Sequence, residues 1–369
     1  MHQSAPAAKA PRQSNLELLR ILSMAIIVLH HYAMHSDFSF PEASVSFNRF
    51  FISALTLFGT LGNVLFVLIS GYFMVTSRFT VRKLLQLWGS VVFYSLLFSA
   101  IFYASGARMP LREIYSTLLP MFTGRYWFAS TYALMFIFSP FMNLLIDHLS
   151  RELHRKLVLM LFVCGSFLQT FIPVFTPFNN LLIFVLLYFL AAYLRLYPDS
   201  LRFLHTRRRC LGVGAAIYVA LLGFLLVDLA FGARFGLLEI LMTNFKRTYS
   251  APLIALGVCI FRGFCLTKMR PNRLINRVAT CAFGIYLVHE HPQIRDYVWL
   301  VLFHSRTYAQ SSLLVLHALA CCAAVFAASL LIELARQATV EKIYLRALDG
   351  VLARIPALQA RWSRMRKCK

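Results

Sequence analysis

The chain has 369 residues, 59% of them hydrophobic, and a formal net charge of +23 at pH 7. A soluble core of this length cannot hide so much apolar surface, so the composition indicates a protein whose solvent is the lipid bilayer. In a soluble protein such a charge would indicate binding to nucleic acid. Here the basic residues lie in short clusters between apolar stretches. The pattern therefore predicts membrane topology and no nucleic-acid partner.

Apolar segments of membrane-spanning length repeat along the whole chain. Crossing about 30 Å of hydrocarbon takes about 20 apolar residues in a helix. Ten segments of roughly that length predict an all-α bundle with ten transmembrane helices. In chain order they are Leu16 to His35, Phe51 to Val75, Leu84 to Ser105, Tyr126 to Asp147, Leu157 to Phe175, Leu181 to Tyr197, Cys210 to Phe231, Tyr249 to Cys265, Val278 to Val298 and Ser312 to Ala335.

The distribution of Lys and Arg predicts the orientation, because short basic loops stay on the cytoplasmic side. Every second loop is strongly basic, and an even number of spans with both termini in the cytoplasm satisfies all the clusters. We expect a cytoplasmic segment at residues 1–15, a transmembrane domain at residues 16–335 and a basic cytoplasmic tail at residues 336–369. The first apolar run has no small-residue cleavage site, so it is expected to remain as the first helix.

The first span carries ionisable residues, which are costly inside a membrane and therefore functional candidates. Arg20 and His31 are eleven residues apart, a step that turns a helix by about 1100°, or three turns plus about 20°. They share one face, about 16 Å apart along the axis, whereas His30 points about 100° away. Glu17 lies within reach of an ion pair with Arg20. Two simpler interpretations stay open: a snorkelling Arg20 and a structural, hydrogen-bonded His31.

The chemistry that these residues suit is proton transfer. An imidazole takes a proton from a hydroxyl group readily, since its ordinary pKa lies near neutrality. The sequence has no nucleophile elbow, no glycine-rich phosphate loop and no metal-ligand set. Its eight Cys residues include no CxxC spacing, so we expect neither a disulfide framework nor a bound metal.

Several short motifs follow one another in a fixed order between Asn15 and Glu333. They are Leu-Leu-Arg20 with His31 eleven residues later, Phe66-Val-Leu-Ile-Ser-Gly-Tyr-Phe73, Arg82-Lys83, Tyr126-Trp127-Phe128, Ala191-Ala-Tyr-Leu-Arg195 and Phe283-Gly-Ile-Tyr-Leu-Val-His289-Glu290. In this order and with this number of spans, the chain resembles the acyltransferase 3 family.

The resemblance implies an enzyme of the bacterial inner membrane. Such an enzyme moves an acyl group, commonly acetyl, from cytoplasmic acyl-coenzyme A to a hydroxyl group of an envelope carbohydrate or a related molecule. Acyl-coenzyme A is then a co-substrate, and no bound cofactor is expected. The family's paired Arg and His correspond to Arg20 and His31. His31 would activate the acceptor hydroxyl, and Arg20 would orient substrate or hold the anionic part of the coenzyme.

Further site residues are predicted at the two membrane surfaces. Arg82 and Lys83 suit the phosphates of the coenzyme, although the chain lacks the family's Arg-x-x-Arg spacing, and the pair could equally be a topological anchor. His289 and Glu290 are expected in the acceptor cavity, unless they only mark a helix end. Trp127 could stack on a sugar ring or belong to an interfacial aromatic belt.

A different class of function also fits these residues. A transporter or flippase for an envelope glycan intermediate, or for the acyl group itself, could use Arg20 and His31 for substrate binding or proton coupling. Transporters often show repeated halves, and no convincing repeat at half length is found here. This alternative is therefore disfavoured but stays open.

Overall fold

The computed structural model describes residues 12–41, 45–106, 108–172 and 179–353. Every regular element in these ranges is helical, which confirms the predicted all-α class. The helices are α1 (Ser14–His35), α2 (Phe47–Met74), α3 (Val81–Ala104), α4 (Leu111–Leu118), α5 (Trp127–His148), α6 (Arg151–Phe162), η1 (Val163–Phe167), α7 (Leu168–Phe171), α8 (Asn180–Leu196), η2 (Arg202–Leu204), α9 (Arg207–Phe231), α10 (Gly236–Phe245), α11 (Ala251–Cys265), α12 (Arg273–Ala279), α13 (Ala282–His289), α14 (Pro292–Asp296), η3 (Tyr297–Leu302), η4 (Ser305–Tyr308), α15 (Leu314–Ala338) and α16 (Val340–Ala353).

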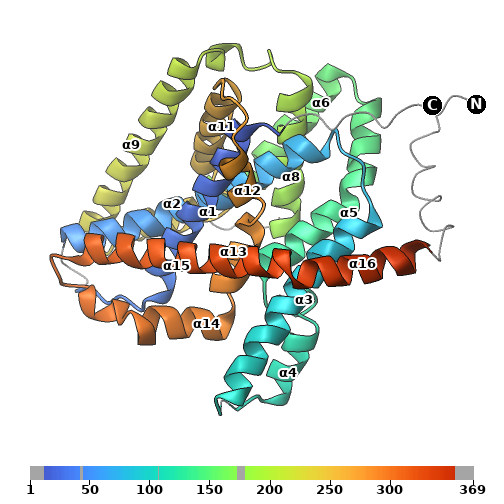
Figure 1. Cartoon of the computed structure of the whole chain (residues 1–369). Coiled ribbons are helices and arrows are strands. Elements are labelled where there is room, and N and C mark those ends of the chain that lie inside the picture. The colour runs from blue at the N-terminus through green and yellow to red at the C-terminus, as the bar shows by residue number, and fades with distance from the viewer. Residues whose placement is uncertain (1–11, 42–44, 107, 173–178, 354–369) are drawn as a thin grey trace, which may run out of the picture.

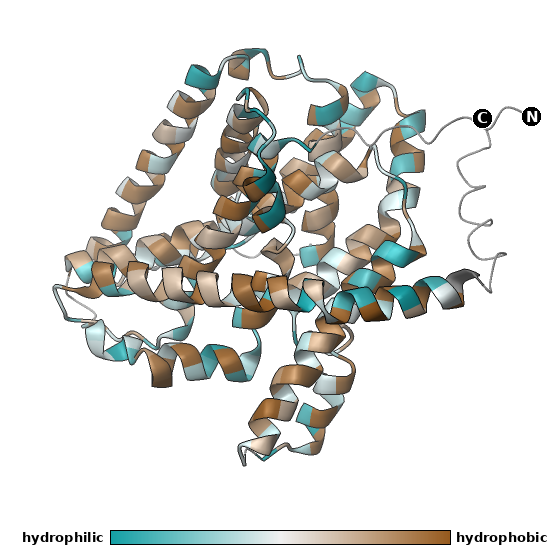
Figure 2. Cartoon of the chain, in the orientation of Figure 1, coloured by the Kyte–Doolittle hydropathy of each residue, from teal (hydrophilic) through white to brown (hydrophobic). Residues whose placement is uncertain are grey.

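Six helical stretches in the described part of the chain are long and apolar enough to cross a membrane. They are α1, α2, α3, α5, α9 and the run from α15 into α16, and α8, α10 and α11 are shorter apolar helices. Figure 2 shows hydrophobic residues along most of α9 and α15, whereas α16 carries many hydrophilic ones. The chain is thus a multi-pass membrane protein. The number of ten spans and the cytoplasmic termini stay predictions. The predicted span end at Phe175, residues 1–11 of the amino-terminal segment and residues 354–369 of the tail lie outside the described residues.

Helix α1 is the central helix of the bundle. It packs against α2, α11, α12, α13 and α15, so elements from both halves of the sequence meet along it (Figure 1). Its closest approach is to α2, where a Cβ atom added at Gly62 would lie 2.7 Å from the Ser23 carbonyl oxygen and 2.7 Å from Ile27 Cγ1. Small residues allow this kind of close backbone approach between membrane helices. The absence of a side chain at Gly62 therefore allows α1 to pack closely on α2.

Replacing Gly62 by Ala should lower the stability of the protein by about 1–3 kcal/mol, because the new methyl group meets a backbone oxygen that cannot move aside. Gly223→Ala is the control, since no atom lies within 4 Å of a Cβ added there. In a helix interior that change should be neutral or stabilising, by up to about 1 kcal/mol. Thermal unfolding in detergent measures both variants, and shifts of the same sign and size would contradict this account.

The ninth predicted span, Val278 to Val298, is not one continuous helix. It is divided into α12, α13, α14 and the π-helical turn η3, with breaks after Ala279 and at Glu290. Pro292 explains the second break, because proline disfavours helical backbone in the residue before it and has no N–H to continue the helix. His291 accordingly has φ −58° and ψ 125°. The break places His289 and Glu290 at the end of a short buried helix, beside α1.

Candidate active site

The end of α1 and the end of α13 bring three histidines and a glutamate together. His31 Nδ1 lies 2.9 Å from His289 Nε2 in a hydrogen bond and 3.1 Å from Glu290 Oε2. His35, one turn further along α1, has its Nε2 3.5 Å from the same carboxylate oxygen. All but His35 are buried. We call these four residues the histidine cluster.

The hydrogen bonds of the cluster decide which nitrogen of His31 can act as a base. His289 Nδ1 lies 2.6 Å from the Ile285 carbonyl oxygen, which only accepts, so Nδ1 of the neutral ring is the donor. His289 Nε2 then accepts, and the proton in its bond to His31 comes from His31 Nδ1. Nε2 of His31 keeps its lone pair and has no hydrogen-bond partner among the described residues. This nitrogen is available to take a proton from a substrate.

Glu290 supplies the negative charge of the cluster. Its side chain is only 9% exposed, and its second oxygen, Oε1, lies 3.5 Å from the guanidinium of Arg295. A buried carboxylate needs such cationic or hydrogen-bonding neighbours to remain charged. If His31 takes a proton, the new positive charge forms 3.1 Å from Glu290 Oε2. The arrangement therefore stabilises the protonated state of the base.

Arg125 supports the break beside the cluster, and sequence reasoning missed it. Its side chain is 2% exposed and donates to Glu113 at 2.7 Å and to His291 Nε2 at 2.9 Å. It also donates to Ser99 and Ser116. It thereby ties the α4 helix to the residue that follows Glu290. The only sequence signal was its position directly before Tyr126 and Trp127.

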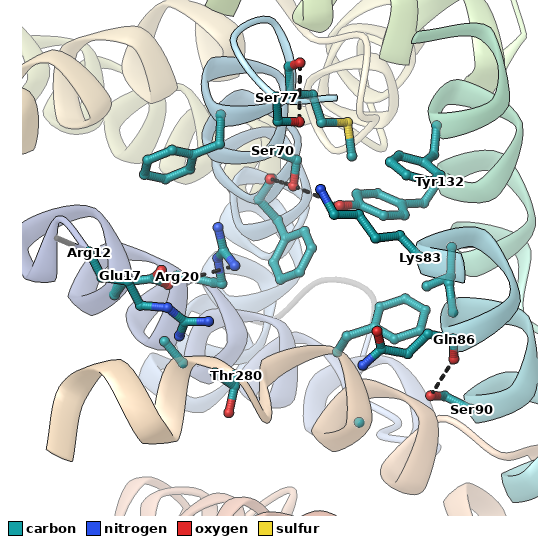
Figure 3. Close-up of a pocket in the computed structure, with 18 of the residues that line it drawn as sticks. Arg12, Glu17, Arg20, Ser70, Ser77, Lys83, Gln86, Ser90, Tyr132 and Thr280 are labelled. Carbon is teal, nitrogen blue, oxygen red and sulfur yellow. Dashed lines mark hydrogen bonds and ion pairs between the residues drawn. The ribbon is translucent and has the colours of Figure 1, made fainter. Parts of the chain in front are cut away.

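A second feature, which we call the inner cavity, opens beside the other half of α1. It has a volume of about 780 Å³ and is lined by residues of α1, α2, α3, α5, α8, α12, α13, α15 and α16. Figure 3 shows Arg20 and Lys83 reaching into it from α1 and α3 on opposite sides. Its charged lining comprises five cations and three acids, which are Arg12, Arg20, Lys83, Arg195, Arg336, Glu17, Glu333 and Glu341. The cavity is therefore net positive and suits an anionic ligand.

Two arginines of the inner cavity retain unused donors. Arg20 lies 3.6 Å from Glu17, yet its Nε is buried without a hydrogen-bond partner in the described part of the chain. Arg336 bonds Glu333 and Glu341 through Nε and one terminal nitrogen, while its other terminal nitrogen is buried and unpartnered. Planar guanidinium groups with free N–H donors are suited to phosphate oxygens. Arg336 was missed because it stands at the predicted end of the last span.

Aromatic rings separate the inner cavity from the histidine cluster. Phe66, Tyr132 and Phe283 line the cavity, and the Phe283 and Tyr286 ring centroids are 6.2 Å apart. Tyr286 in turn lies 6.3 Å from the His289 ring. Arg20 therefore lines the inner cavity, whereas His31, about 16 Å further along α1, belongs to the histidine cluster. We call the rings of Phe66, Tyr132, Phe283 and Tyr286 the aromatic band.

The remaining predicted site residues fall in different places. Lys83 lines the inner cavity, whereas its neighbour Arg82 does not and forms a two-point ion pair with Asp349 of α16, at 2.6 and 3.1 Å. His289 and Glu290 belong to the histidine cluster. Trp127 packs on Phe128 and Phe184 and, within the described residues, lines neither the inner cavity nor the cluster.

Comparison with known proteins identifies the family of the chain. Residues 13–334 match the family model described as an acyltransferase domain. Neither the curated proteins nor the solved structures gave a significant match. Because the family model covers most of the chain, the match establishes the family. The chain belongs to the acyltransferase 3 family of membrane acyltransferases.

Proposed function

We propose that this acyltransferase moves an acetyl group from cytoplasmic acetyl-coenzyme A to a hydroxyl group of a cell-envelope carbohydrate, in the inner membrane of a bacterium. The observation that carries the proposal is the two-part site along α1. One end offers a net-positive cavity for an anionic donor, and the other offers an imidazole nitrogen free to act as a base. The family match supports acyl transfer, and the resemblance to that family implies the acetyl-coenzyme A donor and the carbohydrate acceptor.

The donor would bind from the cytoplasmic side. Its phosphates would lie against the unused donors of Arg20 and Arg336 and the amine of Lys83, all of which line the inner cavity. Arg82 could join them only by leaving Asp349. The coenzyme's thioester arm would extend through the aromatic band, over the roughly 16 Å that separate Arg20 from His31. Apolar rings suit this uncharged arm.

The transfer would take place at the histidine cluster. His31 Nε2 takes the proton of the acceptor hydroxyl while the hydroxyl oxygen attacks the thioester carbonyl carbon. The tetrahedral intermediate collapses with cleavage of the C–S bond, and the thiolate leaves with the proton from His31. Glu290 stabilises the imidazolium that exists between these steps, and His289 holds the Nδ1–H tautomer. Positioned bases of this kind contribute about 10²–10⁴-fold to rate.

Mass spectrometry of the cell-surface glycans tests the proposal. A strain lacking the gene should retain its polymers but lose one acyl mass per modified unit. Wild-type protein should restore that mass, and the His31→Ala variant should not. Loss of the polymer itself would contradict the proposal and favour the transporter. Acyl groups that persist in the strain lacking the gene would also contradict the proposal.

A further inference from the structure

The histidine cluster has the composition of a transition-metal site. One ligand atom each from His31, His35 and Glu290 lies within 4.8 Å of the other two. We propose that these three residues bind Zn²⁺, with His289 as a fourth ligand, and that the bound ion inhibits acyl transfer. The inhibition rests on the proposed function, whereas the binding stands independently of it.

The distances within the cluster are close to those of a tetrahedral site. Zinc bonds to nitrogen and oxygen of about 2.0–2.1 Å place neighbouring ligand atoms about 3.3 Å apart in a tetrahedron. Glu290 Oε2 lies 3.1 Å from His31 Nδ1 and 3.5 Å from His35 Nε2. His289 Nε2 lies 2.9 Å from His31 Nδ1. The ligand atoms of His31, His35 and Glu290 lie within 4.8 Å of one another, so an ion would draw these three together, and His289, which is outside that group, would have to move further.

Two of the donor atoms are enclosed and make no hydrogen bond. Oε2 of Glu290 and Nε2 of His35 are buried, yet neither has a hydrogen-bond partner in the part of the chain that the structure describes. Buried polar atoms are nearly always hydrogen-bonded, and an ion is one of the recognised explanations for exceptions. The two atoms lie 3.5 Å apart, and Oε2 lies 3.1 Å from His31 Nδ1. A cation between them would satisfy both.

The surroundings of the cluster resemble those of established metal ligands. Metal-binding histidines commonly donate their second ring nitrogen to a backbone carbonyl, as His289 Nδ1 does to Ile285 at 2.6 Å. Nitrogen-rich sites with one carboxylate suit Zn²⁺ and Co²⁺ and disfavour Mg²⁺ and Ca²⁺, which require oxygen ligands. The His35 side chain is 20% exposed, so an ion can enter past it.

Metal binding and base catalysis exclude each other at His31. A metal on Nδ1 takes the lone pair of that nitrogen, so the neutral ring then carries its proton on Nε2. Nε2 can no longer accept the proton of an acceptor hydroxyl. Glu290, bound to the same ion, no longer faces a free imidazolium. Zinc should therefore stop turnover without displacing the donor from the inner cavity.

Binding can be measured without any substrate. The purified, tag-free full-length protein in detergent is titrated with Zn²⁺ against a chromogenic chelator, and with Co²⁺, whose visible d–d absorption reports tetrahedral coordination. We expect one tight equivalent and a Co²⁺ spectrum that Zn²⁺ abolishes. His35→Gln removes a direct ligand and should weaken binding by more than the about 10–100-fold that loss of an outer-shell partner costs. His148→Gln is the matched control, because that exposed histidine bonds Leu144 in α5, away from the cluster, and should bind the ion as wild type does.

Acyl transfer is then assayed with increasing Zn²⁺, with Mg²⁺ as the comparison ion. Zinc should inhibit the wild type reversibly, with recovery on adding a chelator, and Mg²⁺ should have no effect. Measured against its own zinc-free rate, His35→Gln should resist inhibition, because it removes a metal ligand. Absence of the tight equivalent, equal affinity in His35→Gln and wild type, or activation by Zn²⁺ would each overturn the proposal. Inactive protein that still binds zinc through His35 would retain the metal site while contradicting the proposed function.

Discussion

His31→Ala should lower the turnover number of acyl transfer by about 10²–10⁴-fold, because it removes the nitrogen that takes the proton of the acceptor hydroxyl. The KM for acyl-coenzyme A should change little, since the inner cavity that would hold the donor does not include His31. Glu290 keeps His35 and Arg295 as neighbours, so the variant should fold. Steady-state kinetics on purified protein in detergent measures both constants.

Two further variants separate the base from its surroundings. Glu290→Gln preserves the shape but removes the charge opposite the imidazolium, and it should lower the turnover number by a smaller factor, on the order of 10²-fold or less. His30→Gln is the neighbouring comparison, because the His30 ring packs beside His31, with ring centroids 5.7 Å apart, and against Gly59 of α2, yet His30 is not one of the four residues of the histidine cluster. A His31→Ala protein that turns over like the wild type, or a His30→Gln loss of equal size, would exclude the proposed base.

The periodicity of the sequence predicts which residues share a face of α1, but it does not predict which residues of other helices that face contacts. Helical geometry places Arg20 and His31 on one face, and hydropathy locates the helix itself. The neighbours of His31 come from α13, more than 250 residues later, and no local pattern encodes that contact. The same is true of Arg336, whose role follows from bonds to Glu333 and Glu341 around the inner cavity.

Hydropathy also predicted the ninth span as one continuous helix, although its sequence contains the proline that breaks it. Pro292 follows His291 directly and is incompatible with an uninterrupted helix at that point. A hydropathy average over a window of residues changes little when it includes one proline, whereas the backbone conformation changes at that residue. The resulting break is what places Glu290 beside α1. The feature that the average hid is therefore the one on which the active-site geometry depends.

Removing Arg20 should raise the KM for acyl-coenzyme A by about 10–100-fold while changing the turnover number much less. Hydrogen bonds to charged groups contribute about 1.5–3 kcal/mol, and each 1.4 kcal/mol corresponds to a factor of ten in affinity. An interaction made equally in the ground state and the transition state changes KM alone. Arg20 lies in the inner cavity, about 16 Å from the base, which is why we expect this separation of the two constants.

The design must avoid leaving a buried charge without its partner. Glu17 is 8% exposed at its side chain and lies 3.6 Å from Arg20, so Arg20→Gln alone would strand a carboxylate. The comparison is therefore made between Glu17→Gln and the double variant Glu17→Gln/Arg20→Gln, which differ only in the guanidinium. Arg155→Ala is the control for basic residues in general, because Arg155 is 56% exposed, pairs with Glu152 and lies outside the inner cavity.

The kinetic pattern then distinguishes two roles for Arg20. A raised KM with an unchanged turnover number assigns it to binding the donor's phosphates, and the Arg155→Ala protein should match the wild type. A fall in turnover number at constant KM would contradict this assignment and place Arg20 in orienting the reacting thioester. Because Lys83 lines the same cavity, Lys83→Ala should show the same pattern as Arg20 but weaker, as expected of a flexible single-point charge compared with a planar fork. Additive losses in the combined variant would indicate that the two side chains hold separate phosphates.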